Sequence, residues 1–304
     1  MGRFDIRTRS GLIYPIIQGE QAIFFQYLLD LYGSAAVAYS LRKLRVGYTG
    51  SAIRIRRSSD NTESDIGFAS NNQLDTGAIN SFAGSGNAFV TKWYDQSGNG
   101  RDAIQPTAAN QPIIQTSGVV ITNGGKPAIE NTSSTFLYTS QTAFTTLQTH
   151  SDFIVLKGKT QTQPGDYTGY LVFGPSLGND FQNTAALTIN TGAITAGKNL
   201  DVGGISPYTI IAAGLVTTFR LISHIITSGS GQVWQNALSV ATASATFSST
   251  NSGSLYIGTR YIGSSVQTTS CFIGYYQEIV SYNLSQSANR TNIESNINTF
   301  YTIY

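Results

Sequence analysis

Charged residues, cysteine and histidine are scarce in this chain of 304 residues, and each shortage excludes a class of protein. Only 11% of the residues are charged, and 18 Lys+Arg against 16 Asp+Glu leave a net charge of +2. This near-neutral balance argues against a charged disordered tail and against a strongly basic nucleic-acid binder. The single cysteine, Cys271, excludes an intramolecular disulfide, and two histidines, His150 and His224, leave little for a metal site. We therefore expect neither a metal nor a cofactor.

Long hydrophobic runs are also missing. No window approaches the ~18 consecutive apolar residues of a membrane-spanning helix, so we expect no membrane insertion. The opening MGRFDIRTRSG lacks the apolar centre of a secretory signal, so we expect the protein to be made and kept in a cytosol.

Short β-branched or aromatic runs dominate the sequence from Tyr48 onward, separated by Gly, Asn, Ser and Pro. They are SAIRIRRS, AFVTKWYD, DFIVLKG, GYLVFG, AALTINT, FRLISHII, QVWQNALSV, SLYIGTR and FIGYYQEIVSY. Nine such runs at intervals of ~10 to 25 residues predict an antiparallel β-sandwich. Residues 219–244 predict three consecutive strands, with the second turn at Gln235-Asn236-Ala237.

Three segments have helical patterns instead. Residues 20–32 place Ile23, Phe24, Tyr27, Leu28 and Leu31 at helical spacing. Ser34 precedes AAVAYSLRKL and predicts a second capped helix. Ser285 precedes a segment in which Ile293, Ile297 and Phe300 share one face, which predicts a closing helix.

Two blocks of sequence resemble a known family. They are AYSLRKLRVGYTGSAIRIRRSSDNTESDIGF and FVTKWYDQSGNGRDAIQ, the second followed by TAANQPII and GGKPAIE. They are similar to the catalytic sandwich of the α-L-arabinofuranosidase B family, and GYYQEIVSYNLS near the end also resembles it. The resemblance implies an all-β fold, a concanavalin A/laminin-G-like antiparallel β-sandwich (jelly roll). To it we add the short N-terminal helices and the C-terminal helix, with residues 1–33 as an attachment arm and 34–304 as the lectin-like domain.

The same resemblance implies where catalytic groups would stand. Its nucleophile is a glutamate on a mid-chain strand, but the only glutamates here are Glu20, Glu63, Glu130, Glu278 and Glu294. Its acid is an aspartate after Ile-Gly-Gly, and the matching residues here are Tyr256-Ile257-Gly258-Thr259-Arg260-Tyr261. Its vicinal disulfide cannot form with one cysteine. Because a retaining glycosidase needs two carboxyl groups ~5 Å apart, we expect no enzymatic activity.

Other carboxylates leave the enzymatic alternative open. Glu278 could act as an acid, although its strand context favours a structural role, bonded to backbone or an arginine. Asp166, Asp180 and Asp201 could substitute as a carboxyl pair, although aspartate is expected in turns of this kind for local hydrogen bonds.

Five residues are candidates for binding a glycan. Asp95 and Asn99, in the loop WYDQSGNG, could bind sugar hydroxyls or Ca²⁺, or they could stabilise a stiff corner. Trp234, Tyr256 and Tyr261 could stack on sugar rings, or they could be core and cross-strand residues. We expect His224, on an apolar strand, to be a hydrogen-bonded core residue.

Basic residues are concentrated early in the chain. They are Arg42, Lys43, Arg45, Arg54, Arg56 and Arg57, with no acid among them. Alternation places the isoleucines of IRIR on one sheet face and the arginines on the other. Arg54, Arg56 and Arg57 could bind an anionic partner. Alternatively they pair with the nearby Asp60, Glu63 and Asp65.

A lectin-type domain without a signal or disulfides suits a protein assembled in a reducing cytosol. We therefore expect a bacteriophage virion structural protein, assembled in the host cytoplasm and released by lysis. It would lie on the capsid or tail surface, as a decoration, head-fibre or receptor-binding component. The expected partners are other virion proteins, further copies of the chain in a homo-oligomer, and host surface polysaccharide. The alternative is a glycoside hydrolase of arabinofuranosidase type.

Overall fold

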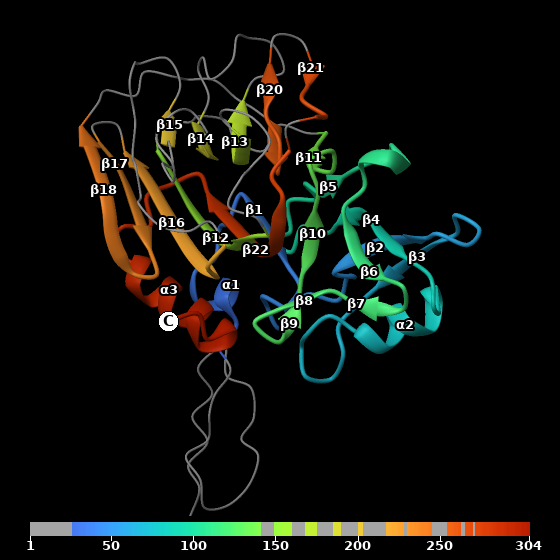
Figure 1. The fold of residues 1–304 in the computed structure, drawn as a ribbon. Coiled ribbons are helices and arrows are strands. Elements are labelled where there is room, and N and C mark those ends of the chain that lie inside the picture. The colour runs from blue at the N-terminus through green and yellow to red at the C-terminus, as the bar shows by residue number, and fades with distance from the viewer. Residues whose placement is uncertain are drawn as a thin grey trace, which may run out of the picture.

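The computed structural model shows a β-sandwich with a few short helices (Figure 1). It describes residues 26–140, 149–159, 168–174, 185–189, 200–202, 217–227, 230–244, 254–262, 265–269 and 271–304. All strand pairings among these residues are antiparallel, as the sequence predicts.

The strands form two layers, which we call layer A and layer B. Layer A consists, in spatial order, of β1 (Val37–Ser40), β22 (Gly274–Tyr282), β12 (His150–Gly158), β16 (Arg220–Thr227), β17 (Ser230–Gln235) and β18 (Leu238–Ser244). Layer B consists of β3 (Glu63–Ile66), β2 (Ile53–Arg57), β4 (Ala88–Trp93), β5 (Ala103–Ile104), β11 (Leu137–Thr139), β19 (Ser254–Ile257), β13 (Thr168–Gly174), β14 (Ala185–Ile189) and β15 (Leu200–Val202).

Smaller elements join or flank the layers. β6 (Ile113–Thr116) and β10 (Ile129–Asn131) link β4 to β22. The remaining elements are β7 (Val119–Val120), β8 (Thr122–Asn123), β9 (Lys126–Pro127), β20 (Tyr261–Ile262), β21 (Ser265–Val266), helix α2 (Thr76–Ala83) and the 3₁₀ turn η1 (Ala108–Asn110). No helix among the described residues is long and apolar enough to cross a membrane.

The main hydrophobic core lies between the two layers. Layer A contributes residues such as Ile154 and Ile222, and layer B contributes residues such as Ile53, Trp93 and Ile257. In β2 the isoleucines are buried and the arginines are half-buried, which confirms the alternation expected from the sequence.

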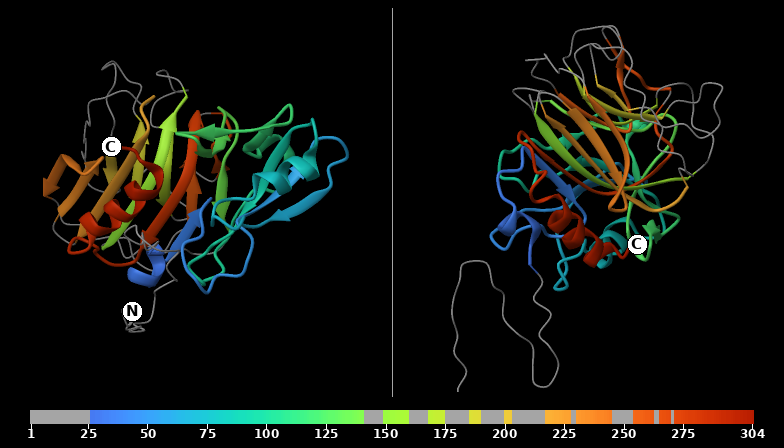
Figure 2. Two further views of the ribbon diagram at one scale, coloured as in Figure 1. Left: turned by 90° about the horizontal axis from the view of Figure 1, so that it is seen from below. Right: turned by 90° about the vertical axis from the view of Figure 1, so that its left-hand side faces the viewer.

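A second hydrophobic core covers the opposite face of layer A. Helix α1 (Leu28–Leu31) contributes Leu28 and Leu29, and helix α3 (Arg290–Tyr301) contributes Ile293, Ile297 and Tyr301. The two helices lie side by side beneath the sheet (Figures 1 and 2). Leu28 and Leu29 therefore receive their apolar cover from the sandwich itself, while the separation of residues 1–33 as an arm stays a prediction.

The segment after Ser34 forms a strand and not the helix that the sequence predicted. Residues 37–40 form strand β1, paired with β22, and Ser34 itself has φ +63° rather than a cap conformation. Val37 and Tyr39 face the main core while Ala38 faces the second core, so both faces of this segment are buried. Burial on both faces removes the alternation that normally identifies a strand, and local helix propensity then misleads.

The other helices were predicted with mixed accuracy. Residues 20–25 lie outside the described residues, and within 26–32 only Leu28–Leu31 is helical. The closing helix is confirmed, but it begins at Arg290 after Asn289 rather than after Ser285. Helix α2 was missed, although Asp75 caps its first turn by accepting from the backbone N–H of Ala78.

The three-stranded prediction for residues 219–244 is confirmed as β16, β17 and β18. Its second turn falls where expected, because Asn236 and Ala237 have φ +52° and +63°. Two consecutive positive φ values characterise the type I′ turn that fits the twist of a β-hairpin.

Candidate functional site

The loop after β4 is held to the start of β1 by Asp95 and Asn99. The Asp95 carboxylate is 5% exposed and accepts hydrogen bonds from the backbone N–H of Ala38 at 2.8 Å and of Arg101 at 3.1 Å. Asn99 Nδ2 donates to the backbone oxygens of Ala35 and Ala36. These side-chain atoms are therefore hydrogen-bonded to the protein's own backbone, as expected if the two residues stabilise a stiff corner. Glycan or Ca²⁺ binding by Asp95 and Asn99 stays a prediction.

The three aromatic candidates occupy different environments. Trp234 is half-buried on β17, with the Arg290 guanidinium 4.5 Å from its ring centre. Tyr256 is 4% exposed on β19 and stacks on Tyr138, with ring centroids 6.4 Å apart. Tyr261 is on β20, but its side chain is not among those that the structure describes. The structure therefore does not bring the five glycan candidates together in one described cluster.

A row of side chains that sequence reasoning missed crosses the outer face of layer B. Neighbouring partners in register place Asp65, Arg54, Lys92, Ile104 and Tyr138 side by side on this face. Their strand neighbours, such as Trp93 and Leu137, point into the main core. The alternation in β2 was the one sequence pattern that pointed to this face. The other strands of the row are far apart in the chain, so no local pattern could show that their side chains lie together.

Tyr94 adds an aromatic ring to this row. Its hydroxyl donates to Asp65 Oδ1 at 2.7 Å, and Lys92 Nζ lies 5.0 Å from its ring centre. Partial burial and the Asp65 carboxylate raise the pKa of Tyr94 to about 12, so this hydroxyl remains a donor at neutral pH. Half-buried tyrosines beside fixed charged groups are chemically suited to stack on and hydrogen-bond a sugar.

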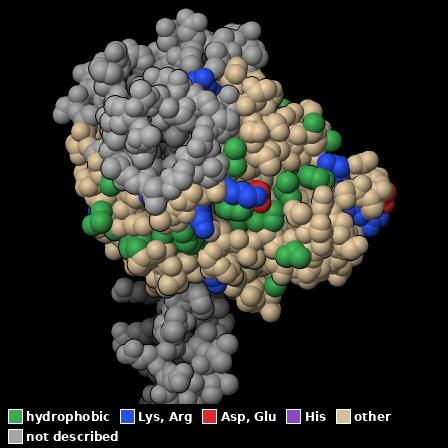
Figure 3. All heavy atoms as spheres, viewed as in Figure 1, with side chains coloured by type: hydrophobic (Ala, Val, Ile, Leu, Met, Phe, Trp, Pro, Cys, Tyr) green, Lys and Arg blue, Asp and Glu red, His purple; other side chains and the backbone are tan. Residues whose placement is uncertain are grey.

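The basic strand pairs with its acidic neighbours, as one of the two interpretations predicts. Arg54 makes two hydrogen bonds to Asp65, at 2.7 and 2.9 Å, and Arg57 makes two to Asp60, at 2.8 and 2.7 Å. Arg56 donates instead to the side chains of Gln111 and Asn61, and its guanidinium lies over Phe89. Basic side chains are accordingly dispersed over the face in Figure 3 and form no continuous patch there.

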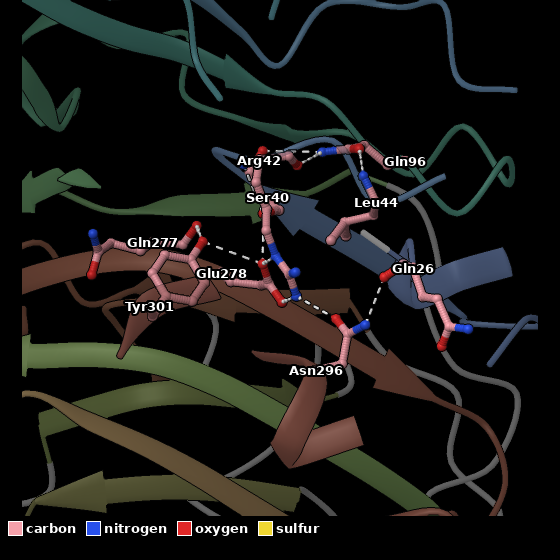
Figure 4. A network of polar contacts seen from close by, with 9 residues as sticks. All are labelled: Gln26, Ser40, Arg42, Leu44, Gln96, Gln277, Glu278, Asn296 and Tyr301. Atoms are coloured by element: carbon pink, nitrogen blue, oxygen red, sulfur yellow. Dashed lines mark hydrogen bonds and ion pairs between the residues drawn. The ribbon is translucent and has the colours of Figure 1, made fainter. Parts of the chain in front are cut away.

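Glu278 lies in a buried ion pair beneath helix α3, which confirms its expected structural role (Figure 4). Both carboxylate oxygens accept from the Arg42 guanidinium, at 2.7 and 2.9 Å, and one also accepts from Ser40 Oγ and Tyr301 Oη. Glu278 is 0% exposed and Arg42 7%. Arg42 also donates to Asn296 of α3, so the pair joins strands β1 and β22 to the helix.

The sequence match to the family's acid falls just after β19, where Ile-Gly-Gly-Asp aligns with Ile257-Gly258-Thr259-Arg260 and places Arg260 at the position of the acid. The hydroxyl of the preceding Thr259 is buried and donates to the backbone oxygen of Gln267, and Cys271 Sγ lies 3.5 Å from that same oxygen. Gly258 has φ +81°, and a Cβ there would lie 2.0 Å from Asn131 Nδ2, so only glycine fits. Asp166 and Asp180 lie outside the described residues, as does the side chain of Asp201.

Both histidines meet one carboxylate inside layer A, a cluster that the sequence analysis did not foresee. Asp152 Oδ2 lies 3.3 Å from His150 Nε2 and 3.1 Å from His224 Nδ1. Burial alone would raise the pKa of Asp152, but the two histidines outweigh it and lower that pKa well below its usual range. Burial lowers the pKa of His224, and Asp152 offsets part of this effect. His224 is thus a hydrogen-bonded core residue, as predicted.

We predict that Glu278→Gln destabilises the protein by about 3–5 kcal/mol, because the Arg42 guanidinium loses its counter-charge in a buried environment. The matched control is Asp65→Asn, which breaks the Arg54 pair at a site where both side chains are about 40% exposed. There the expected loss is at most about 1 kcal/mol. Chemical denaturation of both variants measures the difference. Equal losses would contradict the structural role assigned to Glu278.

We also predict that Cys271 reacts slowly with an alkylating reagent in the folded protein. The thiol is buried, and this burial raises its pKa to about 11, so almost none is thiolate at pH 8. Mass spectrometry after iodoacetamide treatment should show little labelling without denaturant and full labelling in denaturant. Raising the pH toward 11 while the fold persists should speed the reaction only modestly, because burial still limits access. Rapid labelling at pH 8 would refute this description of the thiol.

Known proteins share part of this sequence and most of this fold. Residues 30–141 match the family model for the catalytic part of α-L-arabinofuranosidase B. A search of curated proteins finds no match to the chain.

Solved structures of α-L-arabinofuranosidases have a similar fold at low sequence identity. One is a GH54 enzyme soaked with a cyclic sulfate inhibitor, with a TM-score of 0.66, and another is an arabinofuranosidase complexed with arabinofuranosyl-alpha-1,2-xylobiose, with a TM-score of 0.64. Each is 16% identical, and the similarity covers 89% of this chain and 64% of the other. At this identity the likeness establishes the fold alone. In sequence over residues 30–141 and in fold over most of its length, the chain resembles the catalytic domain of α-L-arabinofuranosidase B.

Proposed function

We propose that this chain is a glycan-recognising protein that does not hydrolyse its ligand, displayed on the capsid or tail exterior of a bacteriophage virion. The observation that carries the proposal is Arg260, an arginine at the position where the resemblance places a catalytic acid. An arginine guanidinium keeps its proton in proteins, so it cannot protonate a leaving glycosidic oxygen.

The remaining carboxylates near the sandwich support the same proposal. Glu278 is fully buried and its oxygens accept from Arg42, Ser40 and Tyr301, so this group cannot reach a sugar without unfolding. No glutamate occurs between Glu130 and Glu278 in the sequence. The mid-chain strands, where the resemblance places the nucleophile, therefore carry no glutamate for that role.

Recognition without hydrolysis needs only a surface that stacks and hydrogen-bonds. The outer row of layer B offers two tyrosines, Tyr94 and Tyr138, beside Arg54, Asp65 and Lys92, whose geometry is fixed by ion pairs. Such groups keep their positions when a ligand arrives, so binding costs little side-chain entropy. We propose this row as the surface that contacts host polysaccharide.

The virion location is supported by what stabilises the fold. The two hydrophobic cores and the buried Arg42–Glu278 pair hold the sandwich together, and the one thiol, Cys271, is buried and free. A protein stabilised in this way can fold in a reducing cytosol, where phage particles assemble. The proposed partners are capsid or tail proteins and further copies of the chain.

We predict that the purified chain binds a host surface polysaccharide and does not turn over an aryl arabinofuranoside. Tyr94→Ala and Tyr138→Ala should each weaken binding about tenfold, the loss of roughly one stacking contact. Tyr304→Ala is the matched control, because Tyr304 is exposed but follows α3 on the other side of the sandwich. A glycan array followed by calorimetry measures the affinities. Turnover by the folded protein would instead establish the alternative, a glycoside hydrolase of arabinofuranosidase type.

We also predict that deleting residues 1–25 prevents incorporation into particles while the sandwich stays folded. The deletion stops before Leu28 and Leu29, because these residues are part of the second core. Circular dichroism tests folding, and purified particles are tested for the truncated chain. Normal incorporation of the truncated chain would refute the attachment arm.

A further inference from the structure

The cluster of His150, Asp152 and His224 lies at the centre of layer A. His150 and Asp152 are two residues apart on β12, so their side chains share one face of the sheet, and His224 is the partner of Asp152 on β16. Ile154 and Ile222 on the same strands point into the main core, which places the three side chains on that inner face. They are buried to 1% exposure or less.

The polar atoms of this cluster are incompletely satisfied by the protein. Among the described residues, Asp152 Oδ1 and His224 Nε2 have no hydrogen-bond partner. Ser281 on β22 is the other strand partner of Asp152, and its buried Oγ also lacks one. A buried polar atom without a partner destabilises the folded chain. The hydrogen bonds among the described residues therefore leave this cluster incompletely satisfied.

Hydrogen bonds alone explain the arrangement poorly. Both imidazoles approach the same oxygen, Asp152 Oδ2, while Oδ1 is left without a partner. Two N–H donors would satisfy both carboxylate oxygens if each donated to a different one. A common ion explains the convergence, since one potential ligand atom from each residue lies within 4.8 Å of the others.

We propose that His150, Asp152 and His224 bind a divalent transition-metal ion of the zinc class. Two imidazole nitrogens and one carboxylate oxygen are a donor set that Zn²⁺ favours. Ligands at about 2.0–2.1 Å around a tetrahedral ion are about 3.3 Å from one another, close to the two measured nitrogen–oxygen distances. The Ser281 hydroxyl, on the same face of the adjacent strand, is placed to hydrogen-bond a water that completes the coordination.

The role of this ion would be structural. The site is buried and joins β12 to β16 at the middle of layer A, so binding stabilises the folded chain by linkage. The proposal departs from the expectation from composition, which counted two histidines as too few and could not foresee that both meet one aspartate. The inference does not depend on the proposed glycan recognition.

The test uses the full chain without a histidine tag, because His150 and His224 are then its only imidazoles. The protein is stripped with a chelator, and Zn²⁺ is added back in equilibrium dialysis with metal analysis. We expect one ion per chain and a rise in Tm on adding Zn²⁺. With Co²⁺ as the probe, we expect the visible absorption of a tetrahedral nitrogen–oxygen site and no thiolate band from Cys271.

Two variants locate the ion. Asp152→Asn keeps the size of the side chain but removes its charge, so stoichiometric binding and the Tm rise should be lost. Asp60→Asn is the matched control, since it removes an exposed carboxylate that pairs with Arg57, and it should bind one ion per chain. If Asp152→Asn does not fold, the wild-type measurements decide. A wild-type chain that binds no stoichiometric Zn²⁺ or Co²⁺, or whose Tm is unchanged by them, overturns the proposal and leaves a hydrogen-bonded cluster.

Discussion

The buried ion pair between Arg42 and Glu278 is the contact on which the arrangement of this sandwich depends. It joins the segment after β1 to β22, and Asn296 and Tyr301 bring α3 to the same point. Gln96 extends the network, since its side chain donates to the backbone oxygens of Ser40 and Arg42 and accepts from the N–H of Leu44. The corner loop, the first strand, the last strand and the closing helix are therefore held through one connected set of polar contacts.

This network also limits the chemistry available to the protein. A buried ion pair is tolerated only when further hydrogen bonds complete it, and Ser40 and Tyr301 provide them for Glu278. A carboxylate held in this way contributes to the structure and cannot also serve a solvent-exposed site. By contrast, the pairs on layer B are about 40% exposed and add little stability, so their main effect is to fix side-chain geometry on an accessible face.

Local patterns were sufficient for much of the fold. The alternation in β2, the turn at Asn236 and Ala237, and the apolar face of α3 were all predicted correctly, because each depends on neighbours in sequence. The strand β1 was mistaken for a helix because its two buried faces hide the alternation. The pairing of the basic strand with Asp60 and Asp65 followed from proximity along the chain.

The candidate sites were harder to predict because they depend on distant strands. Asp152 and His224 are 72 positions apart and become neighbours only through the pairing of β12 with β16. Tyr138 and Lys92 share a face only because β5 lies between their strands. No local motif marks such rows, and in the one motif that was prominent, the loop WYDQSGNG, Asp95 and Asn99 hydrogen-bond the backbone of residues 35–38.

Helices α1 and α3 lie side by side on the same face of the sandwich, so the two outer faces of the molecule differ. Both helices cover the outer face of layer A, whereas the row of tyrosines and ion pairs lies on the outer face of layer B. If a larger assembly binds the segment that leads into α1, or the one that follows α3, it contacts the protein on the same side in either case. The opposite side then points away from the assembly, so that anchoring and contact with the surroundings do not compete for the same surface.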